Sequence, residues 1–307
     1  MLSTRTFAQR RMTMLVAAGA LLLGTFFVLP QGQAFAASLL LLFRGQTLQP
    51  VATDYAHLQN SYKTLEELEK LGSLQGTVPS KLNTVSSVSA AQTMAGFTLA
   101  QPGTFPAGIS KTPATIKALA PTTVTLTLSK ATADAFFKKI GSNQTLPAAY
   151  DGEQLIVDFP GVSLLEYGGS PGSGKLFVGQ AGQLIVDVSG NATVAQLRDY
   201  FLTLPGLSSD TANTLRNITA WQTTIPLGIP TDRVGWQTAN VGGAFAGSGV
   251  ILNDNTGVGS ALLWQTPPKN NQNNQNNTNQ ANGSQSLGVG GWGLKASDVQ
   301  SVASSLR

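Results

Sequence analysis

Five carboxylates gather between residues 151 and 187, and two of them have the spacing of an acid–base pair. Asp158 and Glu166 flank the Pro160-Gly161 turn, so they would face each other if the strands on either side were neighbours. Two facing carboxylates can act as acid and base, or as acid and nucleophile, in glycoside hydrolysis. The pair therefore carries one hypothesis, an envelope hydrolase, while solvated charges on a strand face are the simpler interpretation.

A second candidate group lies near the C-terminus. Asn253-Asp254-Asn255 offers the oxygen ligands of a calcium loop but lacks the distal glutamate, and the same residues are typical of a turn. Tryptophan is favoured at interfaces, although packing of strands against the last helix is the alternative. We therefore predict a partner- or ligand-binding surface at Trp236, Asn253, Asp254 and Asn255. The four tryptophans all lie in the last third of the chain: Trp221, Trp236, Trp264 and Trp292.

Two glycine-rich motifs resemble nucleotide-binding sequences, but each lacks a residue or a preceding strand that phosphate binding requires. In Gly169–Lys175 the following hydroxyl residue is replaced by Leu176, and an apolar strand pattern continues. Gly288–Gly293 precedes a helix but follows a polar tract instead of a strand. We predict a hairpin turn and a glycine-rich strand, and no cofactor. The chain has no cysteine and one histidine, His57, which excludes thiolate and multi-histidine metal sites.

Short strands and short helices must position these residues. Alternating apolar residues predict a strand at 123–128, and four further segments predict an antiparallel meander. Helices are predicted from apolar spacing and from capping boxes that begin at Ser89, Thr193 and Ser297. The meander segments are 155–159, 162–167, 175–178 and 184–188. The helices are 54–71, 89–95, 129–140, 193–204, 208–218 and 297–306.

An Asn/Gln-rich tract, residues 266–286, interrupts the C-terminal strands at 235–240, 244–252, 261–265 and 288–294. The tract has no apolar residues that could offset the entropy of ordering it. We predict a disordered loop inserted between two hairpin strands, because a helix follows. Only 11% of residues are charged, and Gly, Thr, Ser, Asn and Gln are plentiful. This composition predicts an α+β domain of antiparallel sheets with short helices packed on them, over residues 38–307.

The N-terminus predicts export. Residues 1–11 carry three arginines, and residues 12–30 are apolar enough to form a transmembrane helix or a signal h-region. The helix would cross the lipid bilayer once, with the N-terminus cytoplasmic. The alternative is cleavage after Ala36 and secretion. Without the three arginines the net charge of +4 falls to about +1, so no nucleic-acid partner is predicted.

Four segments resemble a bacterial family of membrane-anchored extracytoplasmic domains without an established activity, related to the domains that follow the transmembrane helix of anti-sigma factors. Together with the predicted topology and the lack of a catalytic set, the resemblance favours a non-enzymatic sensor or partner-binding protein in cell-surface signalling, with a membrane or envelope protein as partner. The chain departs from that pattern in its Asn/Gln tract and in lacking a zinc-finger pattern before residue 12. A structural envelope protein is a third hypothesis. The segments are 88–108, 221–232, 252–265 and 297–307.

Overall fold

The computed structural model is built mainly of antiparallel sheets with a few helices, which confirms the α+β prediction. It describes residues 47–55, 67–77, 79, 81–169, 174–205, 209–217, 224–267 and 283–307. The predicted N-terminal span, most of the predicted helix 54–71 and most of the Asn/Gln tract lie outside these ranges. No helix within them is long and apolar enough to cross a membrane.

Three long strands, each kinked once, connect the two main sheets. Each kink falls at proline or glycine residues, where a ladder hydrogen bond is missing or the backbone can bend: Ala120-Pro121, Pro160-Gly161 and Gly182–Leu184. The kinks lie side by side, since the Gly182 N–H donates to the Gly161 carbonyl at 3.1 Å. The three strands are β4 (Thr115–Leu119) with β5 (Thr122–Leu128), β6 (Gln154–Phe159) with β7 (Val162–Gly168), and β8 (Lys175–Ala181) with β9 (Ile185–Ser189).

The predicted meander is therefore wrong in its pairing. β7 and β8 pair in the larger sheet, whereas β6 and β9 pair in the smaller one. The segments themselves were located within a few residues, but the Pro160-Gly161 dipeptide bends one strand between two sheets instead of reversing the chain.

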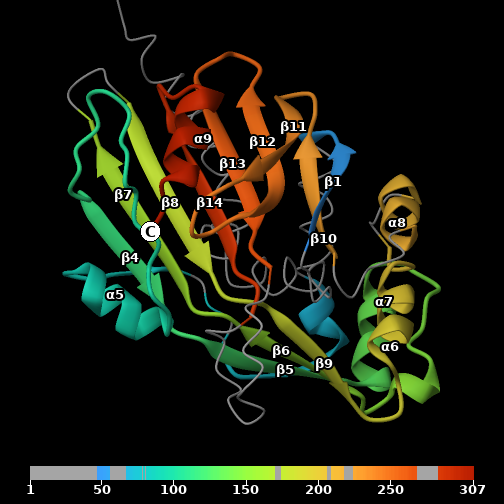
Figure 1. Cartoon of the computed structure of the whole chain (residues 1–307). Helices are drawn as coiled ribbons and strands as arrows, with labels where there is room; N and C mark the ends of the chain where they lie inside the picture. Colours follow the sequence, from blue (N-terminus) through green and yellow to red (C-terminus); the bar gives the residue numbers. More distant parts are fainter. Residues whose placement is uncertain are drawn as a thin grey trace, which may run out of the picture.

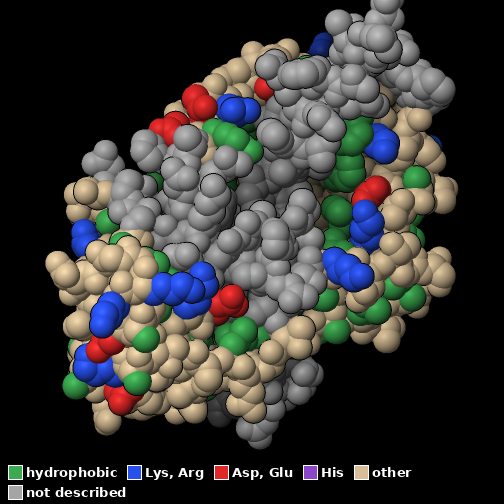
Figure 2. Space-filling model, turned by 180° about the vertical axis from the view of Figure 1, so that it is seen from behind, with side chains coloured by type: hydrophobic (Ala, Val, Ile, Leu, Met, Phe, Trp, Pro, Cys, Tyr) green, Lys and Arg blue, Asp and Glu red, His purple; other side chains and the backbone are tan. Residues whose placement is uncertain are grey.

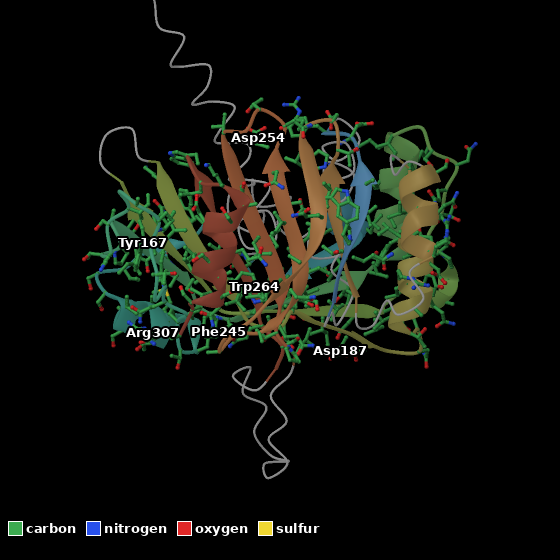
Figure 3. The ribbon with its side chains drawn as sticks, turned by 45° about the horizontal axis from the view of Figure 1, so that its top comes forward. Tyr167, Asp187, Phe245, Asp254, Trp264 and Arg307 are labelled. Carbon is green, nitrogen blue, oxygen red and sulfur yellow. The ribbon has the colours of Figure 1, made fainter. Side chains whose placement is uncertain are left out.

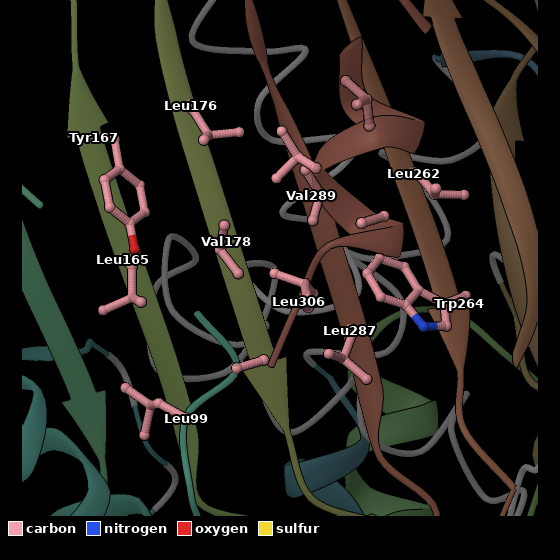
Figure 4. Packing of buried hydrophobic residues seen from close by; sticks show 14 of the residues in the cluster. Leu99, Leu165, Tyr167, Leu176, Val178, Leu262, Trp264, Leu287, Val289 and Leu306 are labelled. Carbon is pink, nitrogen blue, oxygen red and sulfur yellow. The ribbon is translucent and has the colours of Figure 1, made fainter. Parts of the chain in front are cut away.

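The larger sheet has the strand order β11-β12-β13-β14-β8-β7-β4-β3 (Figure 1). One face is covered by α5 (Val88–Ala95), by α9 (Ala296–Ser304) and by the extended segment 97–109. Trp264 lies fully buried at the centre of this layer, among the leucines and valines that Figure 4 shows. The remaining strands are β3 (Asn83–Thr84), β11 (Val234–Val241), β12 (Gly247–Asp254), β13 (Gly259–Gln265) and β14 (Ser286–Trp292).

The opposite face of the β11–β13 region is covered by a parallel pair, β1 (Thr47–Thr53) and β10 (Thr224–Pro230). Leu227 and Ile229 of β10 pack there against Val250, Leu252 and Leu263. β12 and β13 are thus buried on both faces, which explains why they contain continuous apolar runs instead of an alternating pattern.

The smaller sheet, in the order β2-β5-β6-β9, carries η1, α6, η2 and α7 on one face. As predicted, Val124, Leu126 and Leu128 of β5 point into this core, where they meet Phe137 of α6 and Phe201 of α7. These elements are η1 (Glu67–Leu71), β2 (Gly72–Gln75), α6 (Lys130–Lys139), η2 (Ala148–Tyr150) and α7 (Val194–Phe201); α8 (Ser209–Arg216) follows α7 along the chain.

Of the three predicted capping boxes, the structure contains the one at Thr193. Thr193 and Gln196 form the predicted reciprocal capping box of α7. The predicted start at Ser89 is wrong by two residues, because the Ser87 hydroxyl accepts from the Ala90 N–H and caps α5. The start at Ser297 is wrong in the same way, since Asp298 accepts from the Lys295 N–H at 2.9 Å. Ile140, the last residue of the predicted helix 129–140, follows the end of α6 at Lys139 and is 41% exposed.

The end of the chain is tied to the segment that follows α5. Arg307 and Gln101 exchange both backbone hydrogen bonds, at 3.1 and 3.0 Å. The Ser305 hydroxyl also accepts from the N–H groups of Gly103 and Thr104. The last helix therefore packs on the sheet with its end held in place by backbone pairing.

Candidate functional site at the β11 edge

Trp236 stands on β11, the outermost strand at one side of the larger sheet. The side chain is 40% exposed, and only Ile140 is comparably exposed among the large apolar side chains that the structure describes. Its neighbours Gly235, Gln237 and Thr238 are exposed as well. The middle of the strand is thus exposed, whereas its two end residues, Val234 and Val241, are buried.

The four residues of the predicted surface lie close together. Trp236 lies opposite Leu252, and Gly235 lies opposite Asn253, so the predicted group occupies one end of the β11–β12 pair. Figure 3 shows Asp254 at this end of the sheet and Phe245 at the other.

The polar side chains of the Asn253–Gly257 segment form hydrogen bonds that stabilise a turn. The Asp254 carboxylate accepts from the N–H of Thr256 at 3.1 Å and from its hydroxyl, and Asn253 Oδ1 accepts from the Ser260 hydroxyl at 2.9 Å. The φ angle of Gly257 is +71°, a conformation that glycine adopts easily. These contacts account for the segment as a turn, and over the described ranges no three His, Cys, Asp or Glu residues are grouped to hold a metal ion.

A cation–aromatic cluster, which sequence reasoning missed, supports the same end of β11. The Arg233 guanidinium lies 4.1 Å from the centre of the Tyr55 ring, and Asp232 Oδ1 accepts from the Tyr55 N–H at 3.0 Å. Tyr55 follows β1, whereas Asp232 and Arg233 form the corner between β10 and β11. Residues 177 positions apart are thus joined, and no local pattern signals such a contact.

The predicted carboxylate pair does not form. Asp158 belongs to β6 in the smaller sheet, where its Oδ1 accepts from the Thr123 hydroxyl at 2.6 Å. Glu166 belongs to β7 in the larger sheet, where it pairs with Lys117 Nζ at 2.5 Å. The expectation that the two residues face each other on adjacent strands is therefore wrong, for the same reason as the meander.

A second aromatic group lies at the β8–β14 pair. The rings of Phe177 and Trp292 lie 5.2 Å apart between centroids, and Lys175 Nζ lies 5.3 Å from the Trp292 ring. Lys175 is the last residue of the motif that resembles a phosphate-binding loop, so its ammonium group is engaged by an aromatic ring. The hairpin and the glycine-rich strand predicted for the two glycine motifs are confirmed. On the face seen in Figure 2, basic and acidic side chains lie in small mixed groups.

The shifted tyrosine and aspartate pKa values lie away from the neutral range. Burial raises the pKa of Tyr167 to about 12, and burial together with the charge of Asp134 does the same for Tyr200. The hydrogen bond from Lys130, and then that from the Leu146 N–H, lower the pKa of Asp134 below 3.8. Tyr167, Tyr200 and Asp134 therefore keep one charge state around pH 7 and are poor candidates for acid–base catalysis there.

This Asp134 contact predicts a pH dependence of stability. Asp134 bridges Lys130 and Leu146, with oxygen contacts of 2.6 and 2.9 Å. Because the folded pKa is lower than the unfolded one, the stabilisation is complete above the unfolded pKa and is lost as pH falls through the folded pKa. We expect Asp134→Asn to be less stable than the wild type at pH 7 and the deficit to be smaller at pH 3, because the stabilisation is already partly lost below the unfolded pKa. Urea denaturation at both pH values measures the difference, and an equal deficit at both would contradict the assignment.

No known protein family, curated protein or solved structure matches the chain. The resemblance to a family of membrane-anchored extracytoplasmic domains related to those of anti-sigma factors therefore remains a prediction from the residues alone.

Proposed function

We propose that this chain is a non-enzymatic, membrane-anchored extracytoplasmic protein that binds a partner through the β11 edge and takes part in cell-surface signalling. The N-terminal apolar segment anchors it in the bilayer, with the N-terminus in the cytoplasm and the α+β domain outside. The support for the anchor is the arginine-flanked apolar run at residues 12–30.

The exposed indole of Trp236 carries the proposal. Fully burying an aromatic side chain of this size contributes about 1.5–3 kcal/mol, so an indole that stays 40% exposed is available to stabilise a complex. The Arg233–Tyr55 cluster and the Asn253–Gly257 turn both support the end of the strand on which it lies. A rigid strand loses little conformational entropy when a partner binds.

Replacing Trp236 by alanine should weaken the complex without unfolding the protein. We expect affinity capture of the crosslinked, tagged full chain from native membranes to lose at least about 90% of its specific partner, because hot-spot residues contribute 2 kcal/mol or more. Ile140→Ala is the matched control, since that side chain is equally exposed but lies beside α6. Mass spectrometry of the captured proteins and of the N-terminus provides the measurement.

The outcomes of this experiment separate the hypotheses. A partner retained equally by the Trp236 and Ile140 variants would refute the β11 surface. A mature N-terminus at Ala37 would refute the anchor and make the domain a secreted one.

A further inference from the structure

The outer edge of β11 offers unused backbone hydrogen-bonding groups. The Arg233 carbonyl accepts from the Asn255 N–H at 3.1 Å, which fixes the alternation along the β11–β12 register. By that alternation, the N–H and C=O groups of Gly235, Gln237 and Ala239 point to β12, and those of Trp236, Thr238 and Asn240 point away from the sheet. The outward Asn240 carbonyl accepts from Gln300 Nε2 at 3.5 Å, as this assignment requires.

Trp236 and Thr238 have no partner for these outward groups within the ranges that the structure describes. Proteins protect such edges with charged side chains, proline, bulges or very short strands. β11 has eight residues, carries no charge or proline, and pairs with β12 without a bulge. The opposite edge strand, β3, has only two residues. Among the residues that the structure describes, β11 is thus the edge of this sheet that offers room for a further strand.

We propose that the strand that occupies this edge is β11 of a second copy of the chain, paired antiparallel across a two-fold axis at Gln237. The inference rests on the proposed function in that it names the occupant of the same surface. A strand pairs with itself only if its outward groups meet outward groups of the other copy. The two-fold at Gln237 places Trp236 opposite Thr238 of the second copy, and Thr238 opposite Trp236, so both hydrogen bonds form in each pair.

Charge and packing also favour a second copy. The strand is uncharged, so no like charges meet across the axis, and Arg233 lies opposite an uncharged residue, Val241 of the second copy. Trp236 and Thr238 point to the same face of the sheet because they are two residues apart. Each indole therefore lies beside a threonine of the other copy, and aromatic–threonine cross-strand pairs stabilise antiparallel ladders.

Proline at position 238 tests the backbone pairing directly. Proline removes the outward N–H but leaves the hydrogen bonds to β12, and edge strands tolerate it in such positions. Sedimentation equilibrium of the purified full chain in detergent micelles should show a reversible dimer for the wild type and for Thr238→Ala. For Thr238→Pro the dissociation constant should rise at least ~10-fold, because each missing bond occurs twice across the axis. Circular dichroism and the urea midpoint show whether the variant is folded.

A single introduced cysteine tests the register. Gln237 would lie opposite itself in a non-hydrogen-bonded pair, with Cα atoms ~4.5 Å apart, within the range of a disulfide. The chain has no cysteine, so Gln237→Cys should give one crosslinked dimer on mild oxidation. Ala239→Cys is the matched control, on the same face two residues on. Its two copies would be ~13 Å apart along the strands, so it should not crosslink.

Each result decides the inference. A monomer at all concentrations with no more crosslinking by Gln237→Cys than by Ala239→Cys overturns it, and so does a dimer that persists in a folded Thr238→Pro without the Gln237→Cys crosslink. If the chain is monomeric but Trp236→Ala still loses a captured membrane protein, the proposed function survives and only the second copy is refuted. If the dimer forms and Trp236→Ala loses no other protein, the second copy is the only partner supported.

Discussion

Trp264→Ala should lower the free energy of unfolding by about 3–5 kcal/mol, the largest effect expected of any single truncation in this core. The indole is fully buried between β13 and α9, and its N–H donates to the Phe245 carbonyl at 2.8 Å. Truncation leaves a cavity beneath α9 and removes the partner of a carbonyl. Because domains are stable by only about 5–15 kcal/mol, the variant should be close to unfolding at 37 °C.

Urea denaturation followed by circular dichroism measures this loss. Trp264→Phe keeps most of the apolar volume but cannot donate the hydrogen bond, so it should lose about 1–3 kcal/mol. Trp292→Ala is the second control, because that ring is only half-buried and lies on Phe177 outside the core. A loss below about 1 kcal/mol for Trp264→Ala would contradict the packing described for the larger sheet.

Gly161→Ala should cost about 2–3 kcal/mol although it adds only a methyl group. A Cβ at this position would lie 1.8 Å from the Ala95 carbonyl oxygen. The clashing atom is backbone at the end of α5, so it cannot rotate away, and either the kink or the helix must shift. The kink joins β6 to β7, and through them the two sheets.

Gly242→Ala is the control for this substitution, since a Cβ there meets nothing within 4 Å. Its change in free energy of unfolding should stay within about 0.5 kcal/mol of zero. Equal urea midpoints for the Gly161 and Gly242 variants would show that the kink tolerates a side chain, and the packing of α5 against the bend would then be incorrect.

The positions of the strands could be predicted from the sequence, but their distribution between sheets could not. Local alternation located 123–128 and the segments from 155 to 188 because side-chain periodicity is a property of each strand alone. Whether Pro160-Gly161 reverses the chain or only bends it depends on what packs against the dipeptide. Here that is the Ala95 carbonyl, from another element. The carboxylate pair was wrong because it was derived from that pairing.

The proximity of the four surface residues follows more directly from the sequence than the carboxylate pair does, for a related reason. Trp236 lies on β11, and Asn253–Asn255 lie at the end of β12 and the start of the turn that follows it. The β11–β12 hairpin therefore brings them together. The open edge of β11 and the Tyr55–Arg233 contact depend on the order of strands in the sheet. That order is set by pairings between distant segments, such as β8 with β14, which no local pattern encodes.

The backbone hydrogen bonds between Gln101 and Arg307 join segments that are far apart in the sequence, and this separation affects the stage of synthesis at which the chain can fold. β1 can pair only after β10 has been synthesised, and β8 only after β14. The segment that follows α5 likewise needs Arg307 as its hydrogen-bonding partner. Contacts at such sequence separation make folding slow, and the apolar strands β12 and β13 stay uncovered until then. A chain that is still being synthesised therefore cannot complete its larger sheet, and the apolar strands β12 and β13 stay open to aggregation until β14 and residues 305–307 are present.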